Sequence, residues 1–258
     1  MIKIKYKDWY EIDLDDTHHL RKKDTKDWLQ KDFTLFTKFK TDWDSIVKTK
    51  DENQYCNVVG KPGLHAGISI AKNEIYKFDF WTKGESEEPT YNSVGVTEGV
   101  IDNLNFIDVI VGHNLDEKKF YIISYDFDTD KLLSNEQTYD SEIIDYSWCP
   151  TYVGCGYHDE EAGYPHNSWW SGDIERFKIL DSFISKSDIE KLLNPTDYNS
   201  LHETFNQNPY FDFDGKKQVV DSIYDISENN NHLRRQRQAK LTYYNSTQYI
   251  NQSKTSIL

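Results

Sequence analysis

The sequence lacks an apolar run long enough to cross a membrane. None of its runs approaches the ~20 residues that a transmembrane helix requires, so we expect no membrane span. It also lacks a recognisable secretory leader, because charged residues alternate with apolar ones from Met1 to Asp8. The two absences argue against an integral membrane protein and predict a chain that carries no cleaved signal peptide.

Cysteine is scarce. The three residues are Cys56, Cys149 and Cys155, an odd number with none of the spacings that bind metals. Cys149 and Cys155 are close enough in sequence to pair across a loop, but reduced, buried thiols are favoured. A disulfide-stapled scaffold and a cysteine-based metal centre are therefore excluded.

Positive charge is in deficit. The chain has 30 Lys and Arg against 44 Asp and Glu, a net charge of −14, which excludes duplex nucleic acid as a ligand of the whole surface. Because residues 229–258 carry +5 with no acid, residues 1–228 carry −19. The basic end, with Arg234, Arg235 and Arg237, is predicted to bind the acidic body or an acidic partner.

Aromatic residues, in contrast, are abundant at 15% of the chain, and Tyr and Phe favour strands. About ten to twelve short alternating segments are separated by turn residues, a pattern typical of a two-sheet sandwich. The segment from Phe33 to Lys40 carries apolar residues on both of its faces, which favours a strand inside such a sandwich. We therefore predict an all-β, antiparallel jelly-roll sandwich.

One short helix is expected, at residues 185–193. Ser185 is a good N-cap, and Ile184 and Ile189 take the positions of a hydrophobic staple. Asn194-Pro195 then ends the helix, and Pro195 to Gln207 has the composition of a linker. In the strand before this helix, Ile174 is out of phase with later apolar positions, which predicts a β-bulge.

Three segments carry a family resemblance. They are the turn Trp170-Ser171-Gly172-Asp173-Ile174 with the strand and helix that follow, the early strand from Lys31 to Phe39, and the central pair 105–111 and 119–126. In this order they resemble the laminin-G-like, concanavalin-like lectin and glucanase jelly rolls, over roughly residues 6–193. The resemblance implies a two-sheet jelly roll in which Trp170 fills a core position.

The resemblance also suggests a division of the chain. Residues 1–194 form the jelly-roll domain, 195–232 a linker with a strand-like segment, and 233–258 a basic, polar tail. The stretch from Phe211 to His232 resembles a run that usually opens the family's domain, yet here it follows the domain. It could complete the same sheet or be exchanged with a neighbouring subunit, and both alternatives stay open.

The loop after Gly156 is the predicted glycan site. Aromatic faces stack on sugar rings while carboxylates accept hydrogen bonds from hydroxyl groups. The candidate residues share one of these two abilities and are Tyr157, Asp159, Tyr164, His166 and Trp169. An ordinary aromatic loop is the alternative.

An enzymatic alternative rests on the run from Glu11 to Asp15. Laminarinase-type glucanases of this fold carry alternating carboxylates on one strand, which act as nucleophile and general acid. Glu11, Asp13 and Asp15 have that alternation, although Asp15 is one methylene shorter than the usual Glu. An acidic, solvent-facing strand is the interpretation we favour.

No cofactor is predicted, although calcium remains open. Asp126-x-Asp128-x-Asp130 resembles the start of a calcium loop, but Lys131 replaces the glycine that follows, so an acidic β-turn is favoured. His158 to Glu161 together with His166 could bind a cation by proximity, although a solvated loop is favoured.

Together these features predict a non-catalytic binding or structural module that recognises a glycan or a protein partner. A lectin-like chain without export signal or disulfides suits assembly in a cytoplasm and release by lysis, so we place it on a phage or virus particle, as a homo-oligomer or part of a larger assembly. A polysaccharide hydrolase using Glu11, Asp13 and Asp15 and a cellular lectin are the alternatives.

Overall fold

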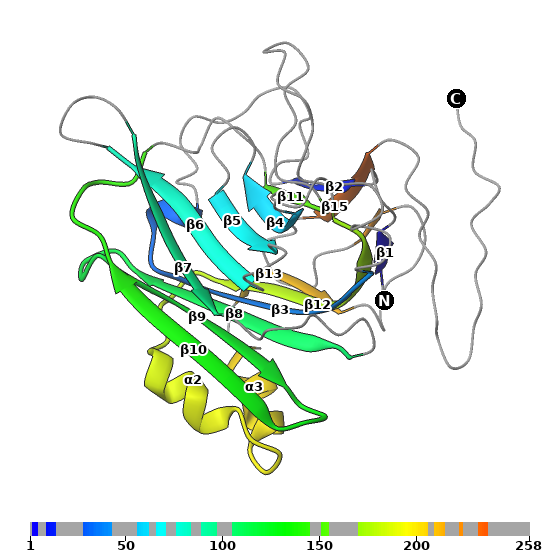
Figure 1. Ribbon diagram of the computed structural model, residues 1–258. Helices are drawn as coiled ribbons and strands as arrows, with labels where there is room; N and C mark the ends of the chain where they lie inside the picture. Colours follow the sequence, from blue (N-terminus) through cyan, green and yellow to red (C-terminus); the bar gives the residue numbers. More distant parts are fainter. Residues whose placement is uncertain are drawn as a thin grey trace, which may run out of the picture.

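Two antiparallel β-sheets face each other, and two short helices pack beneath one of them, in the computed structural model of the chain (Figure 1). The structure describes residues 2–4, 9–13, 28–42, 56–61, 66–70, 76–83, 89–96, 105–144, 151–154, 170–205, 209–214, 222–223 and 232–236. None of the helices in these residues is long and apolar enough to cross a membrane.

The sheet that carries the helices, here called sheet A, has the order β1-β12-β3-β8-β9-β10, and β13 also pairs with β12. Its strands are β1 (Ile2–Ile4), β3 (Phe33–Thr41), β8 (Ile107–Asn114), β9 (Lys119–Asp126), β10 (Lys131–Thr138), β12 (Gly172–Leu180) and β13 (Pro209–Asp214).

The facing sheet, sheet B, has the order β14-β15-β2-β11-β4-β5-β6-β7. Its strands are β2 (Trp9–Asp13), β4 (Cys56–Lys61), β5 (Ala66–Ile70), β6 (Tyr76–Thr82), β7 (Thr90–Val96), β11 (Thr151–Val153), β14 (Ser222–Ile223) and β15 (His232–Gln236). The all-β, two-sheet antiparallel jelly roll predicted from the sequence is confirmed.

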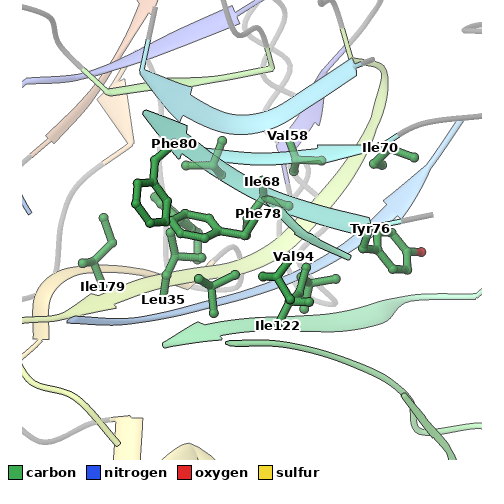
Figure 2. Packing of buried hydrophobic residues seen from close by; sticks show 14 of the residues in the cluster. Leu35, Val58, Ile68, Ile70, Tyr76, Phe78, Phe80, Val94, Ile122 and Ile179 are labelled. Atoms are coloured by element: carbon green, nitrogen blue, oxygen red, sulfur yellow. The ribbon is translucent and has the colours of Figure 1, made fainter. Parts of the chain in front are cut away.

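The main core lies between the sheets and is built by strict alternation. Phe78 and Phe80 of β6 point down from sheet B, and Leu35 of β3 and Ile122 of β9 point up from sheet A (Figure 2). The Phe80 and Phe120 rings meet edge to face at 4.8 Å between centroids. Cys56 is buried in this core and forms no disulfide with the described residues, as the sequence predicted, while Cys149 and Cys155 lie outside the described residues.

A second apolar cluster lies on the outer face of sheet A. Helices α2 (Lys186–Leu192) and α3 (Tyr198–Phe205) cover that face, and Leu201 and Phe205 are fully buried against sheet residues such as Ile110. Sheet A is therefore buried on both faces. This explains why β3 carries apolar side chains at consecutive positions.

Helix α3 corrects the sequence analysis, which took Pro195 to Gln207 for a linker. Tyr198, Leu201 and Phe205 recur at the spacing of one helical face, and all three are buried. The Asn194 side chain accepts hydrogen bonds from the backbone N–H groups of Thr196 and Asp197 at 2.9 and 3.0 Å. The Asn-Pro pair that ends α2 thus also starts the turn that leads into α3.

The local predictions around β12 are confirmed. Its register with β3 shifts between Ile174 and Arg176, which is the expected bulge. The Asp188 N–H donates to the Ser185 hydroxyl at 3.2 Å, so Ser185 is the N-cap of α2. Trp170 is fully buried and packs edge to face on Phe39 with ring centroids 5.7 Å apart.

The two ends of the chain meet in both sheets. β1 and β13 pair with successive parts of the same edge of β12. β15 pairs with β2 in sheet B, which places Arg234 opposite Glu11 and Arg235 opposite Tyr10. Within this single chain, the segment pairs with β12 through β13 and with β2 through β15. Exchange between subunits stays an open alternative, and the division into three regions remains a prediction.

We predict that Leu201→Ala lowers the free energy of unfolding by about 2–5 kcal/mol, because it leaves a cavity between α3 and sheet A. Chemical denaturation measures this loss. Ser200→Ala, on the exposed side of the same helix, is the control and should change stability by less than about 0.5 kcal/mol. Equal, small effects of both substitutions would show that α3 does not belong to the core.

Candidate functional site

The outer face of sheet B carries the candidate site. Alternation along β6 sends Tyr76, Phe78 and Phe80 into the core and therefore places Asp79 and Trp81 on the opposite face. Register extends this face to the neighbouring strands, since Asn57 of β4 lies opposite Ser69 of β5. The members of this face that the site uses come from four adjacent strands and are Asn57, Ser69, Asp79, Trp81 and Tyr91.

Asp79 is the centre of the group. One carboxylate oxygen, Oδ2, accepts hydrogen bonds from the Tyr91 hydroxyl at 2.7 Å and from the Ser69 hydroxyl at 3.3 Å. The side chain is only 3% exposed, and burial raises the pKa of Asp79 to about 7, although these hydrogen bonds and the charge of Lys77 act in the opposite direction. A carboxylate held in this way is costly to the fold, which suggests that it is retained for another purpose.

Asn57 and Asp79 carry three buried polar atoms on this face that have no hydrogen-bond partner among the described residues. They are Oδ1 of Asp79 and both Nδ2 and Oδ1 of Asn57. Native proteins pair nearly all such atoms, and leaving one unpaired costs about 1–3 kcal/mol. Ser69 lies between the two residues, opposite Asn57 and hydrogen-bonded to Asp79, so the unpaired atoms belong to one continuous cluster.

An aromatic pair stands beside this cluster. Trp81 lies opposite Tyr91 in the register of β6 and β7, and their ring centroids are 5.2 Å apart. Tyr91 is 42% exposed, one of the few large hydrophobic side chains of the described residues with so much exposed surface. An accessible aromatic next to hydrogen-bonding groups is the combination that binds the apolar face and the hydroxyl groups of a sugar ring.

The residues predicted as a glycan site, Tyr157, Asp159, Tyr164, His166 and Trp169, lie outside the described residues. Both ends of their loop are described, however. The Gly154 N–H donates to the carbonyl of Val58 at 2.9 Å, and the Trp170 N–H donates to the carbonyl of Gly154 at 2.9 Å. The loop therefore leaves and rejoins the fold beside Val58, the neighbour of Asn57.

The carboxylates of the enzymatic alternative lie on a different part of the same sheet. Glu11 and Asp13 are in β2, with Glu11 opposite Tyr152 of β11, and Asp15 lies outside the described residues. Across the sheet, the register runs from Glu11 through Tyr152, Gly60 and Gly67 to Asp79. Of the predicted partner-binding arginines, Arg234 and Arg235 are in β15 and Arg237 lies beyond the described strand.

The acidic run at residues 126–130 forms a turn, as predicted. Asp126 Oδ1 accepts the backbone N–H groups of Asp128 and Thr129 at 2.9 and 3.4 Å, and Asp130 Oδ1 accepts the Tyr125 hydroxyl at 2.9 Å. The described part of the chain contains no group of three or more His, Cys, Asp or Glu that could hold a metal ion. His158 and the acidic residues after it lie outside that part.

Two other buried polar groups serve the fold. The Tyr198 hydroxyl of α3 donates to Asp108 and accepts from the Lys38 ammonium at 3.1 Å, while burial raises the pKa of Asp108 to about 7. His113 Nδ1 must donate to the Lys31 carbonyl (2.9 Å), so its Nε2 accepts from Tyr139 (2.7 Å). Burial lowers the pKa of His113 to about 4 and keeps the ring neutral.

Sequence reasoning missed the site on sheet B. One signal was available, namely the charged Asp79 at the centre of the aromatic run Phe78 to Trp81. A carboxylate in such a strand must either reach solvent or find partners. Tyr91 and Asn57 are brought near Asp79 by the order of the strands in sheet B, and that order cannot be read from the sequence.

We predict that Asp79→Asn makes stability less dependent on pH. The folded-state pKa of Asp79 is about 7, against an ordinary value of 3.8, so the folded state holds a proton that the unfolded chain loses. The free energy of unfolding of the natural chain should therefore fall by about 4 kcal/mol from this residue as pH rises from 4 through 7.

Denaturation at pH 5 and pH 8 measures the effect. The stability of Asp79→Asn relative to the natural chain should rise by a few kcal/mol between the two pH values. Asp116→Asn, in an exposed turn, is the control and should leave the difference unchanged. Parallel pH profiles for the natural chain and Asp79→Asn would contradict the assignment.

Comparison with known proteins shows the fold. No protein-family model matches the chain, and no curated protein matches its sequence. A candidate carbohydrate-binding protein from Bacteroides ovatus matches with a TM-score of 0.53 and 10% identity, over 92% of this chain and 59% of that protein. At this identity the likeness shows a shared fold alone.

Two further solved structures are similar with TM-scores under 0.5. The CBM40 of the IT-sialidase from Ruminococcus gnavus matches with a TM-score of 0.49 and 11% identity, over 75% of this chain and 96% of the module. Tailspike protein 2 of a bacteriophage of Escherichia coli O157:H7 matches with 0.43 and 12%, over 67% and 22%. The chain is a two-sheet jelly roll by its fold, and membership of the laminin-G-like family remains a prediction.

Proposed function

We propose that the chain is a non-catalytic glycan-binding module, and that the outer face of sheet B holds the sugar. One observation carries the proposal: the exposed Tyr91, in ring contact with the half-buried Trp81, adjoins a buried carboxylate with an unused oxygen. The aromatic rings offer a stacking surface, and Asp79 offers an acceptor to a hydroxyl group.

The predicted loop at residues 157–169 belongs to the same proposed site. The described residues on either side of it are joined to each other, since the Trp170 N–H donates to Gly154 and the Gly154 N–H donates to Val58, the neighbour of Asn57. A site that combines a rigid sheet face with a loop anchored at its border is a common arrangement for recognition, because the sheet positions the polar groups and the loop adds contact area.

We further propose that the chain is part of a phage or virus particle, as a homo-oligomer or within a larger assembly. The separation of charge supports it, since residues 229–258 carry +5 and the rest of the chain carries −19. A basic segment with Arg234, Arg235 and Arg237 suits an acidic surface on a neighbouring copy or on another particle protein.

We predict that Tyr91→Ala and Trp81→Ala each weaken glycan binding about tenfold or more, equivalent to ~1.4 kcal/mol, because each removes part of the stacking surface. A glycan array identifies the ligand for the natural chain, and titration calorimetry measures the dissociation constants. Phe127→Ala is the matched control, because Phe127 is similarly exposed but packs on Tyr198 beside sheet A. Unchanged binding by both Tyr91→Ala and Trp81→Ala would remove the proposal.

We also predict that the natural chain releases no new reducing ends from β-glucans or agars over prolonged incubation. The carboxylates of the alternative mechanism, Glu11 and Asp13, belong to β2, and β4 and β11 separate that strand from β5 and β6. A reducing-sugar assay provides the measurement. Hydrolysis by the natural chain that disappears in the double variant Glu11→Gln, Asp13→Asn would replace binding with catalysis.

A further inference from the structure

We infer that the sheet B site recognises a neutral sugar through two adjacent hydroxyl groups, which bind Asn57 and Asp79. The inference rests on the proposed glycan-binding function and names the class of glycan. It comes from the hydrogen-bonding capacity that the described residues leave unused on this face.

The unpaired polar atoms of Asn57 and Asp79 belong to one cluster. Asn57 and Asp79 are 1% and 3% exposed, and both are neighbours of Ser69: Asn57 lies opposite it in the register of β4 and β5, and Asp79 accepts its hydroxyl. Side chains directly opposite on neighbouring strands, such as Asn57 and Ser69, have Cβ atoms about 4.5–5.5 Å apart, and diagonal neighbours, such as Ser69 and Asp79, are about 7–8 Å apart. Asn57 and Asp79 thus flank Ser69 from the two neighbouring strands, and we infer that one sugar unit placed over Ser69 contacts both.

The kinds of unused atom define the ligand. Asn57 offers one amide N–H₂ donor and one carbonyl acceptor, and Asp79 offers one acceptor, because Tyr91 and Ser69 already donate to its other oxygen. The ligand must therefore supply two donors and one acceptor. Two adjacent hydroxyl groups do so: one donates to Asp79 Oδ1, the other donates to Asn57 Oδ1, and a hydroxyl oxygen accepts from Nδ2.

An acidic sugar fits these atoms poorly. A sugar that places its carboxylate at these atoms supplies acceptors only, so it would satisfy Asn57 Nδ2 and leave both unpaired oxygens facing a negative charge. Lys77, at the next outward position of β6, does not offset the burial of Asp79, whose pKa is raised to about 7. A second buried negative charge beside this carboxyl group would be strongly unfavourable.

A bare cation also fits incompletely. Calcium prefers oxygen ligands, and the two unpaired oxygens would suit it, but the Asn57 amide N–H₂ would then remain without an acceptor. A neutral ligand with paired hydroxyl groups satisfies all three atoms.

The test uses the full chain and immobilised polysaccharides in matched pairs. The first pair is a neutral polysaccharide, mannan or starch, before and after oxidation by periodate. Periodate cleaves the bond between two carbons that carry adjacent hydroxyl groups, and borohydride then reduces the resulting aldehydes to alcohols. The second pair is polygalacturonic acid and its methyl ester, which keep the same ring hydroxyl groups and differ in whether the carboxyl group is charged or methylated. We expect periodate treatment to weaken binding at least tenfold and the ester to bind at least tenfold more tightly than the acid.

Site variants link the preference to these residues. Asn57→Ala and Asp79→Asn should each weaken binding to the untreated neutral polysaccharide about tenfold, whereas Asn135→Ala, an exposed amide on β10, should not change it. Asp79→Asn is also expected to stabilise the fold at pH 8, so weaker binding by a more stable protein cannot come from unfolding. Asn57→Ala and Asp79→Asn variants that bind like the natural chain would show that water alone satisfies these atoms, and would overturn the inference.

The outcomes separate the two levels of the proposal. Binding that survives periodate, that favours the free acid, or that EDTA abolishes and calcium restores would overturn the paired-hydroxyl inference and leave glycan binding in place. A natural chain that binds no sugar on a broad glycan array, including both matched pairs, would overturn both.

Discussion

The burial of sheet A on both of its faces is the constraint on which the rest of the structure depends. Its inner face meets sheet B through Phe33, Leu35 and Phe39, and its outer face is closed by α2 and α3. Strands buried on two sides cannot expose a ligand site without losing part of a core. The recognition surface is therefore left to sheet B, whose outer face is not covered by either described helix (Figure 1).

Within sheet B, position 79 shows how one strand can serve both the fold and a site. Phe78 and Phe80 bury their rings between the sheets and so set which face of β6 points into the core. Because side chains alternate along a strand, Asp79 must then lie on the outer face. The carboxyl group is held by Tyr91 and Ser69 from the two neighbouring strands. Its geometry is thus preorganised by the same packing that stabilises the sandwich, although its burial costs stability.

The sequence was sufficient for the architecture where short-range chemistry decides it. Alternating aromatics predicted the strands, Ser185 predicted the helix cap, and the phase of Ile174 predicted the bulge. The prediction was wrong at α3, because Tyr198, Leu201 and Phe205 stand in a polar segment after a proline and were interpreted as part of a linker. Only the apolar outer face of sheet A gives these three residues a partner. The cluster of Asn57 and Asp79 was also missed, since these residues are brought together by strand order alone.

The pairing of the chain's ends has a consequence for biosynthesis. β12 receives β1 and β13 along one edge, and β2 receives β15, and the pairing of β2 with β15 spans more than 200 residues of sequence. Such distant pairings form slowly, because the entropy of closing so large a loop is lost before the contact forms. On the ribosome, the edges of β2 and β12 must wait unpaired until the C-terminal strands emerge, and in that interval the nascent chain is most exposed to aggregation and most dependent on chaperones.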